Sequence, residues 1–251
     1  MTEYRVLGPA WTKWPLYVSV GLLTLIIGAL IHEAMPLYLV LMVFVFAPLL
    51  QRHQVAIGRW LQSLPGPLLV KFLLLGYAGV IVEETIIGTV HMINEGFNVA
   101  EWHERIGQFI AFNLFAFTGL ILGLFIIARR YRFHALDGWI IAGAWGLIGE
   151  RTILAISANP VGSLLLLLPT MAIYSVIVTP ALLSLPEEKR GRRDFRAPWR
   201  HFTAWALMLV MSIIPMIGLA VLRDQHPDAF PKCEYIPCLN EEAEDQPLMI
   251  D

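Results

Sequence analysis

Three glutamates lie inside long apolar runs, where ionisable side chains are rare: Glu83, Glu84 and Glu150. A charge surrounded by hydrocarbon is costly unless it is paired or reaches a wet cavity, so such residues mark structural pairs or functional sites. Arg151 directly follows Glu150 and carries the same cost. These four are our candidate catalytic residues. The glutamates would act as acids, bases or metal ligands, and the arginine would hold an anion or a carboxylate.

A second set of residues has a spacing that suits metal binding or proton transfer. Glu84 and His91 are seven residues apart, and His91 and Glu95 are four apart, so all three share one face if the helix continues past Gly88. His103 begins the next apolar run and would close the site from the other side. We therefore predict His91, Glu95 and His103 as ligands of a divalent metal ion, or as proton shuttles.

Two simpler interpretations of the glutamates stay open beside a catalytic or ion-binding pocket. Arg151 would bridge Glu83 or Glu84 on another helix and hold the two helices together without any chemistry. Alternatively, the charges lie among lipid headgroups because a helix ends earlier than expected. This second alternative applies best to Glu83 and Glu84, about one turn from the outer end of their predicted span.

The composition defines the class of protein that must position these residues. Of the 251 residues, 57% are hydrophobic and 15% are charged, and the mean hydropathy is +0.64. A soluble domain has about 45–50% apolar and about 25% charged residues, so an ordinary soluble enzyme and a disordered protein are excluded. The net charge of −2 excludes a nucleic-acid-binding module, and two cysteines exclude a disulfide scaffold. A multi-span membrane protein remains.

A bilayer core of roughly 30 Å needs about 20 apolar residues of helix. We predict an all-α, polytopic helical bundle over residues 1–222. The second span is short and closely follows the first, so six spans with a re-entrant segment are the alternative. The seven predicted spans are Trp14–Ile31, Met35–Leu50, Leu68–Gly88, Phe109–Ala128, Gly138–Ile156, Val161–Leu183 and Phe202–Leu222.

Lysine and arginine accumulate in cytoplasmic loops and therefore predict the orientation. With the N-terminus inside, 14 of the 18 basic residues are cytoplasmic. The prediction is N-in/C-out, in an integral protein of a bacterial or archaeal cell membrane. The outside then keeps only Arg105, Arg151, Arg223 and Lys232.

The segment from residue 223 to residue 251 reads as an acidic extracytoplasmic tail with eight acidic residues. It also contains Cys233 and Cys238. In an oxidising compartment these would form a small-loop disulfide, and otherwise they are two free thiols.

An internal repeat links the candidate helices. Gly76, Gly79, Glu83, Thr85 and an isoleucine on either side of that glutamate recur 67 residues later, and Gly28 to Ala34 form a fainter copy. We therefore predict parallel helical hairpins around a shared cavity, plus a seventh helix. Small residues let neighbouring helices approach closely, so Gly76 with Gly79, and Gly143 with Gly146, would turn the acidic ends inward.

The loop from His91 to Gln108 reads as an amphipathic helix in the membrane interface, acting as a connector or a lid. A retinal pigment is excluded, because the four lysines lie at span ends, in loops or in the tail, and the seventh span has none. The first functional expectation is a membrane-embedded enzyme acting on a lipid-like or apolar substrate. The alternatives are a proton- or cation-coupled transporter and a non-catalytic subunit of a membrane complex.

Overall fold

The computed structural model describes residues 35–132, 135–150, 160–191, 193–194 and 198–226. The chain is all-helical there apart from one pair of two-residue strands, which confirms the expected fold class. The elements are α2 (Met35–Val40), the π-helix η2 (Leu41–Phe46), α3 (Ala47–Ser63), α4 (Leu68–Glu95), α5 (Val99–Arg130), β1 (Tyr131–Arg132), α6 (Ala135–Gly149), α8 (Pro160–Leu183), the short helix η3 (Glu187–Lys189), β2 (Arg193–Asp194) and α9 (Pro198–Gln225).

Four helical segments of the described chain are long and apolar enough to cross a membrane. A chain with several such helices is an integral, multi-span membrane protein. The helix Ile140–Gly149 is apolar but shorter, and the predicted first span, residues 14–31, lies outside the described residues. The four segments are Leu37–Ser63, Val99–Arg130, Leu166–Leu183 and Trp199–Gln225.

Several predicted helix boundaries are wrong. The fifth span was predicted to reach Ile156, but α6 ends at Gly149. The second span does not end at Leu50, because α3 continues to Ser63 as an amphipathic helix that buries Leu61 and exposes Arg52. The predicted interfacial helix over His91–Gln108 is not a separate element. α4 runs on to Glu95, and Gly96 breaks the chain with a φ of 93°. α5 then begins at Val99, capped by the Asn98 side chain, which accepts a hydrogen bond from the Ala100 amide.

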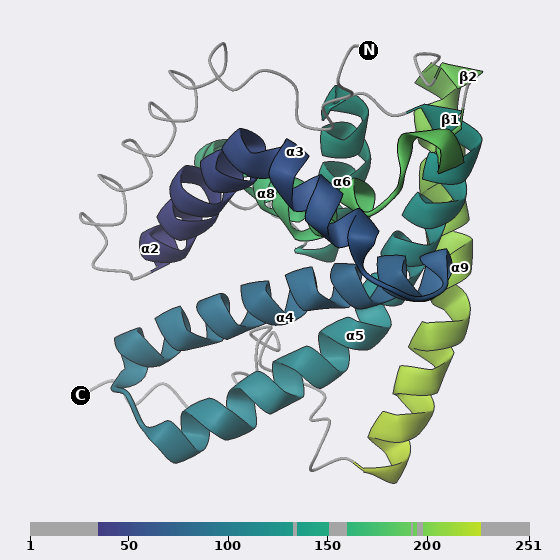
Figure 1. Ribbon diagram of the computed structural model, residues 1–251. Coiled ribbons are helices and arrows are strands. Elements are labelled where there is room, and N and C mark those ends of the chain that lie inside the picture. The colour runs from purple at the N-terminus through teal and green to yellow at the C-terminus, as the bar shows by residue number, and fades with distance from the viewer. Residues whose placement is uncertain (1–34, 133–134, 151–159, 192, 195–197, 227–251) are drawn as a thin grey trace, which may run out of the picture.

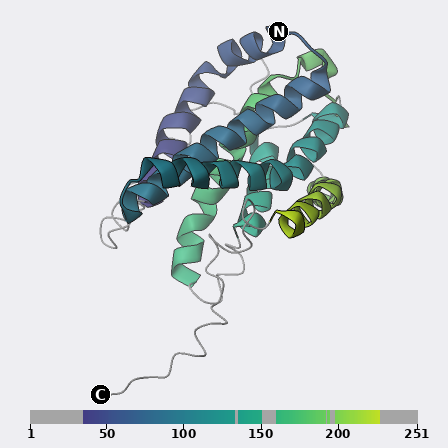
Figure 2. The same ribbon diagram turned by 90° about the horizontal axis from the view of Figure 1, so that it is seen from below.

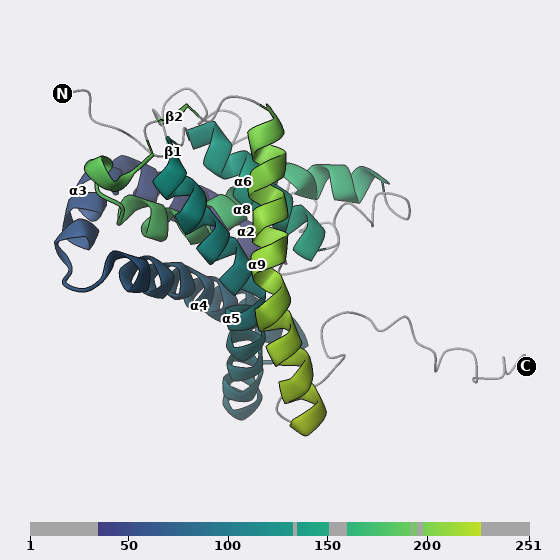
Figure 3. The same ribbon diagram turned by 90° about the vertical axis from the view of Figure 1, so that its right-hand side faces the viewer.

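α8 is the central helix of the described chain. It packs against α3, α4, α5 and α6, while α9 packs along α5 (Figure 1). Seen from below, α2 and α9 lie on opposite sides of the molecule with α4, α5 and α8 between them (Figure 2). Turned to the side, α5 and α9 run together past the lower edge of the other helices (Figure 3).

The glycines of the predicted repeat do let helices approach closely. A Cβ atom on Gly79 would lie 2.1 Å from the backbone oxygen of Ile177 in α8, so the α4 and α8 backbones touch there. A Cβ on Gly146 would lie 2.3 Å from the ring of Tyr174, also in α8. Both glycines therefore bring their helices against the same central helix, as small residues do in membrane proteins.

The end of α3, the start of α4, the end of α5 and the segment after α8 meet at one end of the bundle. The Gln62 side chain donates to the Leu183 backbone oxygen at 2.9 Å, and the Gly191 amide donates to the Ala128 oxygen at 3.0 Å. Because its described cations are so numerous, we call this region the basic end. They are Arg59, Lys71, Arg129, Arg130, Arg132, Lys189, Arg190 and Arg200.

Candidate functional site

Glu83 is buried in the middle of the bundle, with 5% of its surface exposed. It lies one helical turn after Gly79, where α4 touches α8. The hydroxyl group of Tyr38, on α2, donates a hydrogen bond to the Glu83 carboxyl group. Tyr38 is itself 6% exposed, so this contact satisfies two polar groups that water does not reach.

Glu84 is also buried, with 6% exposed, and it points toward α5. The Asn113 amide of that helix donates a hydrogen bond to its carboxyl oxygen. The carboxyl groups of Glu83 and Glu84 are adjacent on α4 and lie close enough to interact electrostatically. Each carboxyl group is thus held by a side chain of a different helix.

Glu150 directly follows the last residue of α6 and is exposed in the described chain. The hydroxyl group of Tyr174 donates to its carboxyl oxygen at 2.6 Å. The Tyr174 ring is held by stacking on Phe117 of α5, with ring centroids 5.4 Å apart. The Glu150 charge interacts electrostatically with both Glu83 and Glu84. The three glutamates thus belong to one cluster, supplied by α4 and by the end of α6.

A second polar layer lies between α4 and α5, two helical turns from Glu84. The hydroxyl groups of Tyr77 and Thr118 are hydrogen-bonded at 2.6 Å. Thr118 also donates to the backbone oxygen of Leu114 at 2.6 Å. At 1.5 Å per residue, this layer is about 10 Å along α4 from Glu84, toward the basic end. Polar groups therefore extend from the glutamate cluster toward the basic end.

The remaining predicted site residues are placed less completely. α4 does continue past Gly88, so the backbone positions of Glu84, His91 and Glu95 share a face as expected. His103 is exposed near the start of α5. Among the described side chains, no three His, Cys, Asp or Glu residues gather closely enough to hold a metal ion. The Glu95 side chain and Arg151 lie outside the described part, so the metal set and the arginine bridge stay predictions.

Three partners of the glutamates were not predicted from the sequence: Tyr38, Asn113 and Tyr174. Each is a hydrogen-bonding side chain in an otherwise apolar run, and that was the available signal. A buried tyrosine hydroxyl or amide group needs a partner, so one such residue opposite an unpaired glutamate predicts a contact. The spacing within a single helix could not reveal these partners, because each lies on a different helix from its glutamate.

Replacing Tyr38 with phenylalanine should lower the free energy of unfolding by about 1–2 kcal/mol, because the buried Glu83 carboxyl group loses its hydroxyl donor. Unfolding with sodium dodecyl sulfate in mixed micelles would measure the change. Tyr77→Phe is the matched control, since Thr118 keeps its bond to Leu114 when the Tyr77 hydroxyl is removed. A loss no greater in Tyr38→Phe than in Tyr77→Phe would contradict a role for Tyr38 in holding Glu83.

Fold and site together define an all-helical, multi-span membrane protein with a cluster of glutamates, tyrosines and an asparagine between its helices. No protein-family model matches this chain, and no curated protein or solved structure is significantly similar to it. The function must therefore be inferred from the chemistry of the cluster.

Proposed function

We propose that this protein is a membrane-embedded enzyme that uses the glutamate cluster for acid–base chemistry on a lipid-like or apolar substrate. The observation that carries the proposal is the pair of adjacent buried carboxyl groups, Glu83 and Glu84, which accept hydrogen bonds from Tyr38 and Asn113 on two other helices. Two carboxyl groups in unlike environments are the usual equipment for giving one proton and taking another.

Each residue of the cluster has a proposed role. One member of the Glu83–Glu84 pair would donate a proton to the substrate, and the other would accept a proton or stabilise developing positive charge. Tyr38 and Asn113 orient the two carboxyl groups. Glu150 is exposed, so it would meet the substrate at the rim of the site, oriented by the Tyr174 hydroxyl. His91, Glu95, His103 and Arg151 complete the proposed site from the same side of the membrane.

The proposal includes a seven-span, N-in/C-out arrangement with an internal repeat, in a bacterial or archaeal cell membrane. Clustering of cations at the basic end supports the orientation, because positive charge favours the cytoplasmic side. The glutamate cluster would then lie toward the outer leaflet. Glu83 and Glu150 occupy equivalent repeat positions, and each accepts a hydrogen bond from a tyrosine on another helix, which supports the repeat.

The experiment uses the full chain in lipid nanodiscs, incubated with a total lipid extract and followed by mass spectrometry. The wild-type protein should convert at least one lipid species, and Glu84→Gln should not. Glutamine keeps an oxygen that accepts the Asn113 hydrogen bond, so this variant preserves that contact but cannot exchange a proton. Conversion that is equal in both proteins would overturn the acid–base role.

Proton-coupled transport is the second candidate, and the Tyr77–Thr118 layer favours it, because polar groups then extend inward from the glutamates. Liposomes that enclose a pH-sensitive dye distinguish the two functions. Proton flux in the wild type, absent in Glu84→Gln and without lipid conversion, would replace the enzyme with a transporter. If neither lipid conversion nor proton flux occurs, both proposals fail and the remaining expectation is a non-catalytic subunit of a membrane complex.

A further inference from the structure

We propose that a groove at the end of α5 binds the headgroup of an anionic phospholipid. The groove has a volume of about 580 Å³ and is lined by Phe125, Ile126, Arg129 and Arg130. Asn113 and Arg129 are sixteen residues apart on the same helix, which is about 24 Å at 1.5 Å per residue. The groove is therefore separate from the glutamate cluster and independent of the function proposed for it.

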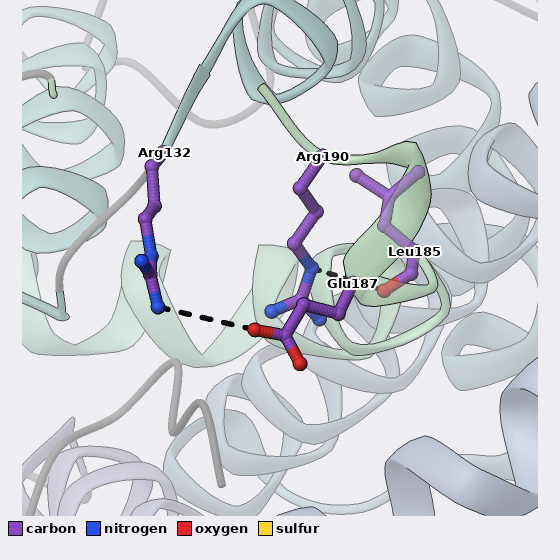
Figure 4. A network of polar contacts seen from close by, with 4 residues as sticks. All are labelled: Arg132, Leu185, Glu187 and Arg190. Atoms are coloured by element: carbon purple, nitrogen blue, oxygen red, sulfur yellow. Dashed lines mark hydrogen bonds and ion pairs between the residues drawn. The ribbon is translucent and has the colours of Figure 1, made fainter. Parts of the chain in front are cut away.

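Three described cations of the basic end are engaged by protein groups. The Lys71 ammonium donates to the Leu64 oxygen at 2.9 Å. Figure 4 shows the Arg190 guanidinium donating to the Leu185 oxygen, at 3.0 Å, and Arg132 paired with Glu187 at 3.9 Å. These side chains fix the chain segments of the basic end to one another, so their charges are engaged in the fold.

Arg129 and Arg130 differ from these neighbours. Both side chains are exposed, and within the described residues neither has a carboxylate partner. The Arg129 guanidinium lies over the Phe125 ring, 5.8 Å from its centroid, which leaves its N–H groups available. Two adjacent arginines offer several N–H donors with a net charge of two, which suits the oxygens of a phosphate group.

The rest of the groove is apolar and rigid. Phe125 packs edge-on against the fully buried Phe72, with ring centroids 5.2 Å apart, so this wall is anchored in the core. Ile126 is 40% exposed beside it. A phospholipid has the matching distribution of chemistry, with acyl chains for the apolar wall and a phosphate for the arginines. Basic pockets at the membrane boundary recognise anionic headgroups in this way.

The test must separate a defined site from the diffuse attraction that any basic residue exerts on an anionic membrane. Native mass spectrometry of the full-length protein, with phosphatidylglycerol or phosphatidylcholine of identical acyl chains added, measures lipid retention. We expect the wild type to retain phosphatidylglycerol about tenfold better than phosphatidylcholine, and the double variant Arg129→Gln/Arg130→Gln to lose that preference.

The matched control is Arg52→Gln/Arg59→Gln on α3, which removes the same charge from two exposed arginines outside the groove. This control should keep the preference for phosphatidylglycerol. Equal loss in both double variants would mean diffuse attraction, and unchanged retention in Arg129→Gln/Arg130→Gln would mean no site; either result overturns the proposal. If that double variant does not fold, the single Arg130→Gln variant gives the same comparison, because among the described residues the exposed Arg130 side chain makes no hydrogen bond or ion pair that the substitution would remove.

Discussion

Replacing Gly79 with alanine is expected to lower the free energy of unfolding by about 3 kcal/mol. The new Cβ would lie 2.1 Å from the backbone oxygen of Ile177, and a backbone atom cannot turn aside as a side chain can. α4 and α8 would have to separate along their contact, which loosens packing over several residues. Unfolding with sodium dodecyl sulfate in mixed micelles measures the change.

The control for this prediction is Gly107→Ala on α5. A Cβ at Gly107 would meet nothing within 4 Å, so the substitution should be neutral or stabilise the helix by up to about 1 kcal/mol. If Gly79→Ala were as stable as Gly107→Ala, the close approach of α4 and α8 would be wrong. Glu83 would then lack the α4–α8 contact that buries its side chain between the helices.

The Glu150→Gln variant is expected to fold normally and to lose at least about 100-fold in the rate of lipid conversion. Glutamine retains an oxygen that can accept the Tyr174 hydroxyl, so the contact between α6 and α8 survives. What the substitution removes is the negative charge and the ability to take a proton. The rate of lipid conversion in nanodiscs and the thermal unfolding temperature are measured on the same preparation. Together they distinguish a loss of activity from a loss of stability.

Glu104→Gln provides the comparison for Glu150→Gln. Glu104 is exposed on α5, and within the described part of the chain its side chain accepts one hydrogen bond, from the Gln108 amide at 3.4 Å, so its loss should leave both measurements unchanged. A Glu150→Gln protein that fails to accumulate would support the structural interpretation of the glutamates. A folded and fully active Glu150→Gln protein would remove Glu150 from the site.

The sequence predicted the fold class and most of the helices, because continuous apolar runs of span length admit few other structures. α4 begins at the predicted Leu68, and α8 ends at the predicted Leu183. At α6 the predicted span was too long, since the helix ends at Gly149, and two other errors occurred where polarity was taken as the end of a helix. α3 continues past Arg52 because its polar residues lie on one face. α4 continues past its predicted end at Gly88 because the chain turns away only at Gly96.

The candidate site was predictable only in part. Apolar surroundings identified the glutamates, and the glycine spacing correctly predicted that α4 and α6 approach a neighbouring helix closely. Which helix that would be was not predictable, since the choice of α8 depends on packing across the whole bundle. For the same reason the partners Tyr38, Asn113 and Tyr174 could not be assigned, because each contact joins residues at least 24 positions apart.

The pairing of Glu83 and Glu84 with residues of other helices has a consequence for how the protein enters the membrane during synthesis. α4 carries both carboxyl groups and is not among the four described segments that are apolar enough to span by themselves. An acidic residue in mid-span disfavours release from the translocon into lipid by about 2.5–3.5 kcal/mol. Asn113 emerges from the ribosome later than α4, on the next helix. We therefore expect α4 to remain in the translocon until α5 has been synthesised, so that the two helices enter the lipid together as a hairpin.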